Sequence, residues 1–220
     1  MIIAVYDGAN IVKAHQDVIV VTFKYIPLPL AFCNSMSTEC PLLTLVQSLY
    51  SYRLNIFGFP ATTSVPVGKT NLGLFDQRQA VVWVRDNIAH FGGDPDKITL
   101  FGESAGSASV VTYMFSYPDD PIARGFIAQS QYHLGPGLPN EFSRVATNVG
   151  CVKETESEVF ECMMKADGKL IADSIGNVTT NPGGLPVVDN ITVWSPDGYV
   201  EQARKGRFAH KVSWHRKGKR

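Results

Sequence analysis

The strongest candidate for chemistry in this sequence is Ser104, at the centre of Gly102-Glu103-Ser104-Ala105-Gly106, which fits the pattern G-x-S-x-G. In this pattern the serine stands on a sharp, strained turn between a strand and a helix, where bulky neighbours two residues away would collide. The N-terminus of the helix then points at the reacting carbonyl, and the backbone N–H of Ala105 can donate a hydrogen bond to the oxyanion. The pattern favours acyl transfer by Ser104, and a turn of small residues is the alternative.

A serine nucleophile needs a base, and the base needs a carboxylate to orient it. When the serine lies on such a turn, the chain order is serine, acid, histidine. Three histidines follow Ser104, namely His133, His210 and His215. His133 lies in the turn-rich stretch "SQYHLGPGLPN" and is interpreted as a surface loop residue, and the other two stand in the terminal tail. We therefore expect the histidine base to be absent from this chain.

The elements that must position Ser104 follow from hydrophobic patterning. Apolar or β-branched runs predict strands or extended segments over residues 17–23, 52–59, 98–102 and 125–130. Helical spacing predicts helices over residues 72–90, 104–116, 141–151, 157–166 and 197–209. Strands that alternate with helices indicate the α/β class with a mostly parallel sheet. Ser104 is then expected where a strand meets a small-residue helix.

Composition narrows the function further. The chain has 220 residues, with 20 Lys and Arg against 20 Asp and Glu, so no polyanion such as nucleic acid is indicated as a partner. No apolar run is long enough for a transmembrane segment, and the four cysteines form no metal-ligand pattern. The stretch "VGKT" (67–70) is not a phosphate loop, because Thr63 stands where a glycine is required. The first residues, "MIIAVYDGAN", do not read as a signal peptide.

Longer stretches carry a family resemblance. The segments "SYRLNIFGFP", "NLGLFDQRQAVVWVRDNIAHFGGDPDKITLFGESAGSASV" and "PVVDN" resemble the type-B carboxylesterases, which include cholinesterases and fungal lipases of the α/β-hydrolase fold. The likeness is dense over residues 52–130 and looser to about residue 210, and "YDGANIVKA" and "VVDNITVWSPDGYVEQA" look like a fungal member. The resemblance implies cofactor-free hydrolysis of small-molecule or lipid esters by a Ser–acid–His triad, with Ser104 as nucleophile and Ala105 supplying an oxyanion-hole N–H.

The same resemblance bears on the cysteines and on the compartment. It implies a disulfide between Cys151 and Cys162, and two buried free thiols are the alternative in a reducing compartment. The sequons at Asn177 and Asn190 matter only if the chain is secreted. The family suggests secretion, whereas the first residues carry no export signal, so the localisation stays open.

Three interpretations of function remain. The chain resembles an esterase or lipase, yet the family's Gly-rich oxyanion loop, acid and histidine are not found in it, so we expect a partial domain that is catalytically incompetent. A cholinesterase-like binding or adhesion module is the alternative from another class, and an intact serine turn argues against it. An α/β-hydrolase sheet with missing strands would also expose apolar faces and an open edge, which predicts poor solubility.

Two segments do not resemble the family. Residues 24–50 are proline-rich and patternless, and residues 212–220 form a basic tail. Suitable codons at Lys24 and Ser51 would make residues 24–50 an unspliced intron whose removal leaves the reading frame intact and gives "VVTFNYRLNIFGFP". A similar intron start fits Lys211 to Ser213. A lineage-specific surface insertion is the alternative, because loops tolerate insertions. Residues 1–211 are then a partial carboxylesterase domain, and Cys33 and Cys40 carry no function.

Overall fold

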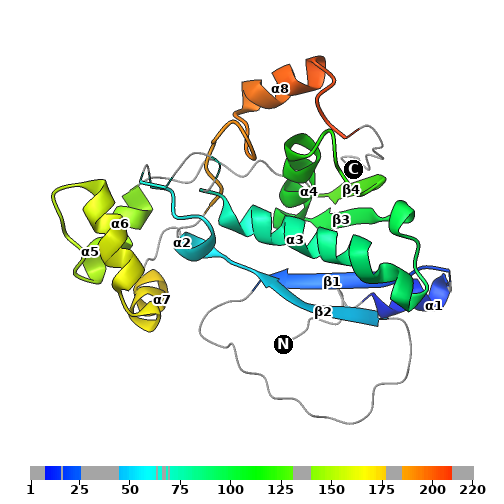
Figure 1. Cartoon of the computed structure of the whole chain (residues 1–220), viewed down its shortest axis with the longest axis horizontal. Helices are drawn as coiled ribbons and strands as arrows, with labels where there is room; N and C mark the ends of the chain where they lie inside the picture. The colour runs from blue at the N-terminus through cyan, green and yellow to red at the C-terminus, as the bar shows by residue number, and fades with distance from the viewer. Residues whose placement is uncertain are drawn as a thin grey trace, which may run out of the picture.

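A computed structural model of the chain describes residues 8–15, 17–25, 45–62, 64–65, 68, 70–130, 140–176 and 185–209. The strands are β1 (Val20–Tyr25), β2 (Leu45–Tyr52), β3 (Thr99–Glu103) and β4 (Gly125–Gln129). The helices are α1 (Ala9–Ala14), α2 (Asn55–Gly58), α3 (Leu72–Asn87), α4 (Ala105–Ser116), α5 (Asn140–Asn148), α6 (Glu156–Lys165), α7 (Gly168–Gly176) and α8 (Pro196–Arg204), with 3-10 turns at Ile88–Phe91 and Pro95–Lys97. Figure 1 shows their arrangement.

The unit that carries Ser104 is β3–α4–β4. Strands β3 and β4 pair in parallel, from Thr99 opposite Gly125 to Glu103 opposite Gln129, and α4 forms the crossover between them. Met114 and Phe126 are each only 2% exposed in the core that α4 and β4 share with α3. A parallel pair joined by a helix is the pattern expected of an α/β fold, so the predicted class is confirmed.

One face of this sheet is open among the described residues. Leu100 packs against the core, while its neighbour Phe101 points to the other side and is 55% exposed. Such alternation follows from the pleat of a strand, which sends successive side chains to opposite faces. The outer face of β3 therefore carries an aromatic side chain that the described residues leave half exposed.

A second parallel pair joins β1 to β2. Val20 lies opposite Leu45 and Tyr25 opposite Tyr52, with an irregular register between Thr22 and Lys24. Ile19 and Val21 pack against the same core as α4 and β4. The extended segment predicted over residues 52–59 is wrong beyond residue 54, because the chain turns into α2 at Asn55, where φ is 53°.

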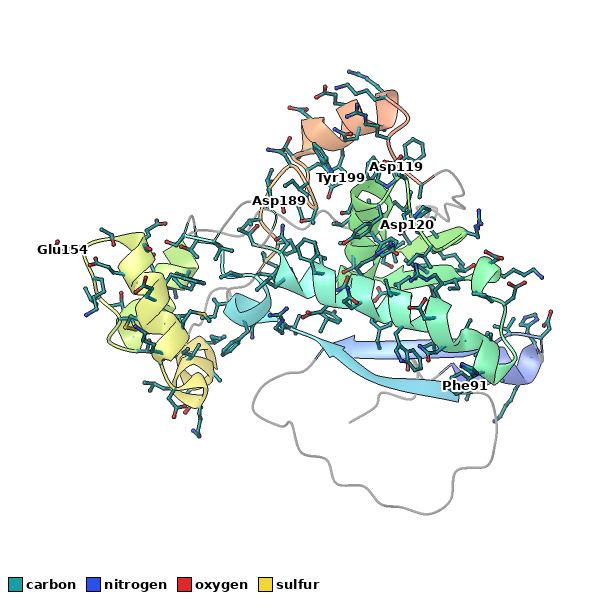
Figure 2. The ribbon with its side chains drawn as sticks, in the orientation of Figure 1. Phe91, Asp119, Asp120, Glu154, Asp189 and Tyr199 are labelled. Atoms are coloured by element: carbon teal, nitrogen blue, oxygen red, sulfur yellow. A yellow bond between two sulfur atoms is a disulfide. The ribbon has the colours of Figure 1, made fainter. Side chains whose placement is uncertain are left out.

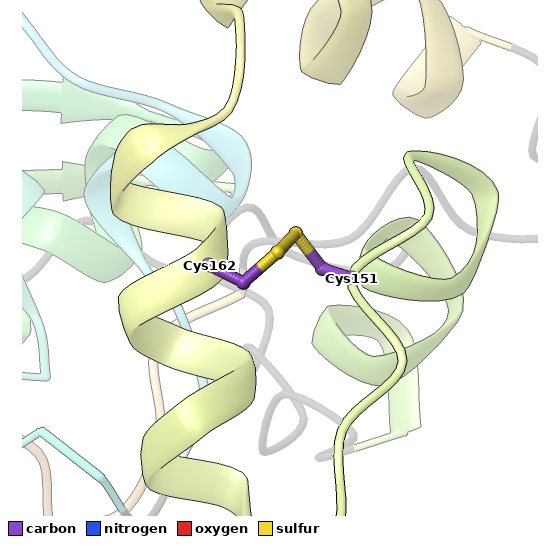
Figure 3. The surroundings of a disulfide bond; sticks show 2 residues. All are labelled: Cys151 and Cys162. Carbon is purple, nitrogen blue, oxygen red and sulfur yellow. A yellow bond between two sulfur atoms is a disulfide. The ribbon is translucent and has the colours of Figure 1, made fainter.

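The helices α5, α6 and α7 form a cluster at one end of the molecule, next to α2, whose Ile56 belongs to the same core (Figure 1). Phe142, Val145 and Met163 are buried in its core, and a disulfide joins Cys151 to Cys162, with the two Cα atoms 5.6 Å apart (Figure 3). Thr155 and Glu158 cap the start of α6 reciprocally. Helix α7 was not predicted from the sequence. None of the helices in the described part of the chain is long and apolar enough to span a membrane.

Candidate active site

Ser104 occupies the turn between β3 and α4, where the sequence predicts it. Its backbone has φ 55° and ψ −117°, and its side chain is exposed. A non-glycine residue rarely adopts a positive φ of this kind, and the strain persists only where the surrounding structure enforces it. Here the Ser104 N–H donates to the carbonyl O of Gln129 at 3.0 Å, which ties the turn to the end of β4.

The two glycines of the motif play different parts. A Cβ atom on Gly102 would lie 2.2 Å from the carbonyl O of Gly106, so only glycine permits β3 and α4 to approach this closely. A Cβ atom on Gly106, by contrast, would meet no atom of the described residues within 4 Å. The collision expected two residues from Ser104 is therefore real on the strand side and is not found on the helix side.

The first turn of α4 is the part of the structure where the sequence predicts the oxyanion donor, the N–H of Ala105. The first intrahelical hydrogen bond of α4 runs from the Ala108 N–H to the carbonyl O of Ser104 at 3.1 Å. The N–H groups of Ala105, Gly106 and Ser107 consequently have no acceptor within the helix, as at any helix start. They lie beside Ser104 and carry the positive end of the helix dipole, which favours a developing negative charge.

Helix α4 is held against α3 from beneath the site. The Ser109 hydroxyl donates to the carbonyl O of Ala105 at 3.2 Å and accepts from Gln77 Nε2 at 3.2 Å. Because Gln77 is buried on α3, the first turn of α4 cannot shift without breaking this chain of hydrogen bonds. The geometry of the serine turn thus depends on α3 as well as on β3 and α4.

An arginine fixes the far end of α4. Arg78 of α3 donates to the Tyr113 hydroxyl and to Asp120, and its guanidinium lies 4.3 Å from the ring centroid of Tyr117. The Tyr113 hydroxyl donates in turn to the carbonyl O of Pro121 at 2.9 Å. Burial raises the pKa of Tyr113 to about 12, so its hydroxyl stays protonated and serves as a structural donor.

The described part of the chain brings no histidine to Ser104 as a base. His15 and His90 are exposed and precede β3 in the chain. His133, His210 and His215 lie outside the described residues. No group of His, Cys, Asp and Glu side chains among the described residues could hold a metal ion.

Asp189 is a buried carboxylate that follows Ser104, and its hydrogen bonds show that it has a structural task. It accepts the backbone N–H groups of Ile191, Thr192 and Val193 at 2.7–3.0 Å and the Thr192 hydroxyl at 2.7 Å. Asn71, at the start of α3, donates from Nδ2 to Asp189 Oδ2 at 3.2 Å and to Thr192 Oγ1 at 2.9 Å. We call Asn71, Asp189 and Thr192 the loop clasp. Figure 2 labels Asp189 on the connection that leads to α8.

The electrostatics of the loop clasp favour an ionised Asp189. Burial by itself would raise the pKa of this carboxyl group, but the hydrogen bonds from Val193, Ile191 and Thr192 outweigh it and hold the pKa below its ordinary value. In the sequence, "PVVDN" carries a family resemblance and does not by itself predict the loop clasp. The available signal was the aspartate followed by an asparagine, because Asp side chains in turns accept the backbone N–H two residues further on, as Asp189 does from Ile191.

The other predicted site residues are placed as follows. Asn190 is exposed beside Asp189, with φ 57°. Asn177, Cys33 and Cys40 lie outside the described residues, as do residues 26–44 and 210–220.

Comparison with known proteins is consistent with this geometry. A model of the carboxylesterase family matches residues 45–212. The chain is 37% identical over 173 residues to a chlorogenic acid esterase of Aspergillus niger. The aligned region covers 73% of this chain and 32% of that protein. It is 41% identical over 167 residues to secreted lipase 5 of Gibberella zeae, covering 69% and 31%, and 34% identical over 169 residues to neuroligin-2 of Rattus norvegicus, covering 74% and 20%.

The chain therefore belongs to the carboxylesterase family, which has the α/β-hydrolase fold. It spans about a third of the length of the two fungal relatives and a fifth of neuroligin-2. The resemblance recognised in the sequence is thus confirmed at the level of the family.

Proposed function

We propose that Ser104 is the nucleophile of a carboxylic ester hydrolase, with the Ala105 N–H donating to the oxyanion. Ser104 Oγ attacks the ester carbonyl carbon while its proton passes to a base, the alcohol leaves, and water then hydrolyses the acyl-enzyme. The observation that supports this proposal is the strained, exposed backbone of Ser104 at the N-terminus of α4. The substrate is a small-molecule or lipid ester.

We further propose that the 220-residue chain by itself does not turn over esters. The described histidines precede the serine, and the buried carboxylate of Asp189 is fully engaged by its own loop. A serine without base and acid retains only weak catalysis from the oxyanion donors, because the proton of its hydroxyl has nowhere to go.

A fluorophosphonate probe and a soluble p-nitrophenyl ester test both parts. We expect the purified chain to be neither labelled nor active above its Ser104→Ala variant. We expect a longer protein, extended with the coding sequence that flanks this reading frame, to be labelled and to hydrolyse the ester. Its Ser104→Ala variant should do neither. Ser107→Ala is the matched control, because Ser107 is buried one turn further along α4. An extended Ser104→Ala protein that keeps its labelling would contradict the assignment, and a labelled 220-residue chain would contradict its inactivity.

A binding module is the second candidate, and the likeness to neuroligin-2 is compatible with it. Binding alone does not require a serine at positive φ, and this backbone conformation costs about 1–3 kcal/mol of stability. The esterase proposal accounts for this strain, because the strained turn places an exposed hydroxyl beside the N–H groups at the start of α4. Labelling of Ser104 in the extended form discriminates between the two.

A further inference from the structure

Thr192 of the loop clasp is also the last residue of a sequence motif that the proposed function leaves unused. Asn190-Ile191-Thr192 is an N-x-T sequon, the acceptor pattern for N-linked glycosylation. Its acceptor residue, Asn190, is exposed on the turn that its own left-handed backbone (φ 57°) creates, and its backbone N–H donates to the carbonyl O of Val193 at 3.0 Å. The amide that would carry a glycan therefore lies at the surface of the fold.

Thr192, the third residue of the sequon, is buried, in contrast to Asn190. Thr192 is 2% exposed, and its hydroxyl donates to Asp189 Oδ2 at 2.7 Å and accepts from Asn71 Nδ2 at 2.9 Å. The enzyme that glycosylates a sequon must engage this hydroxyl, since the pattern demands serine or threonine at that position. Once the loop clasp has formed, the hydroxyl is out of reach.

We propose that Asn190 carries an N-linked glycan and receives it before the loop clasp closes. The Asn190 amide nitrogen bonds to C1 of the first sugar of a lipid-pyrophosphate-linked oligosaccharide. The C1–O bond to pyrophosphate breaks, the lipid pyrophosphate leaves with that electron pair, and the amide gives up one proton. The folded clasp then buries Thr192 beneath a modified, exposed Asn190.

Two further observations support this site. The disulfide between Cys151 and Cys162 belongs to the oxidising secretory compartment in which such transfer takes place. The loop also exposes apolar side chains, because Ile191 is 50% and Val188 is 39% exposed. A glycan on Asn190 would shield this apolar surface from water and from other chains.

The first experiment asks whether the site is used. The full chain is directed into the secretory pathway of a fungal host, denatured, and treated with peptide-N-glycosidase, so that the readout does not depend on folding. We expect a mobility shift that Asn190→Gln reduces by one glycan and that Thr192→Ser preserves. Asn177→Gln is the matched control for the other sequon. An Asn190→Gln chain that loses as many glycans on treatment as the parent chain would overturn the proposal.

The second experiment tests the order of events. Solubilised oligosaccharyltransferase and its lipid-linked donor are offered a synthetic peptide of residues 185–195 or the folded, unglycosylated chain. We expect the peptide to be modified at least tenfold faster than the folded chain. Asn71→Ala, which leaves the sequon intact and removes one restraint on Thr192, should be modified in cells at least as fully as the parent. Equal rates for peptide and folded chain would overturn the order, as would loss of the glycan in Asn71→Ala.

Discussion

Gly102 and Gly106 stand on either side of Ser104 in one motif, yet the structure requires glycine at only one of them. A methyl group on Gly102 would press into the carbonyl of Gly106 at 2.2 Å, whereas one on Gly106 meets open space among the described residues. We predict that Gly102→Ala destabilises the chain by about 1–3 kcal/mol. Gly106→Ala should stay within about 1 kcal/mol of the parent, because alanine suits a helix.

Chemical denaturation followed by circular dichroism measures both glycine variants. Each variant is the control for the other, because both add one methyl group to a glycine of the same motif. Equal losses of stability would mean that α4 does not approach β3 as closely as described.

Asp189 is the second residue whose chemistry can be tested alone. Asp189→Asn places an NH₂ group among hydrogen-bond donors, and we expect a loss of about 2–3 kcal/mol at pH 7. Because the folded-state pKa is lowered, the stabilising contribution is complete above the ordinary aspartate value of about 3.9 and is lost as the pH falls through the folded pKa.

The difference in stability between parent and Asp189→Asn should therefore shrink below about pH 4. Thermal unfolding between pH 7 and pH 2.5 measures it, with the exposed Asp119→Asn as control. A difference that is constant over this range would show that Asp189 is not ionised in the fold.

At the scale of elements, the disulfide joins the loop after α5 to α6 in a cluster with a core of its own. We predict that Cys151→Ser with Cys162→Ser costs about 2–4 kcal/mol, and that the loss is confined to this cluster. Hydrogen exchange should rise over residues 140–176 and around Ile56 of α2, which shares their core, and stay unchanged in β3 and α4, because none of the buried residues that the structure describes belongs to both cores.

The matched control for the disulfide is Cys33→Ser with Cys40→Ser, which lies in the segment that does not resemble the family. We expect that pair to leave exchange in the helical cluster unchanged. Faster exchange in β3 after removal of the disulfide would show instead that the two cores unfold together.

Local patterning explains which elements the sequence could predict. The serine turn, β3, α4 and β4 are specified by neighbouring residues, so periodicity and glycines were enough to locate them. Helix α7 was missed although Ile171 and Ile175 lie one turn apart and Asp167 accepts the N–H of Lys169 at the helix start. Its short length and its glycine ends hid that signal.

Long-range contacts explain what the sequence could not predict. The hydrogen bond between Asn71 and Asp189 joins residues 118 positions apart, and the local sequence around either residue does not predict the other as its partner. The pairing of β1 with β2 is likewise a matter of register, which patterning alone does not set.

At the scale of the whole molecule, residues 24–50 begin at the end of β1 and run to residue 50 of β2, and the family match starts within them, at residue 45. Lys24 lies opposite Ser51, and Tyr25 opposite Tyr52, in strands that run in the same direction. Neighbouring strands are about 4.8 Å apart, little more than one residue step. A chain that passes from Phe23 to an asparagine at position 51 and on to Tyr52 would therefore need only a small shift.

Segment 24–50, which we propose is translated intron, should thus be dispensable. Its deletion removes residues 45–50 of β2, so that β1 would run directly into residues 51–54. We predict that deletion of residues 24–50 with Ser51→Asn preserves soluble yield and thermal stability, because Ile19 and Val21 keep their packing against the core around α4 and Arg53 keeps its ion pair with Asp76 of α3. Deleting residues 26–44 alone is the matched control. It keeps all of β2 but must join the end of β1 to the start of β2 across about 16 Å, so we expect this shorter deletion to lower soluble yield and thermal stability. A stable protein from the shorter deletion but not from the longer one, or a mature transcript that retains the segment, would contradict the proposal.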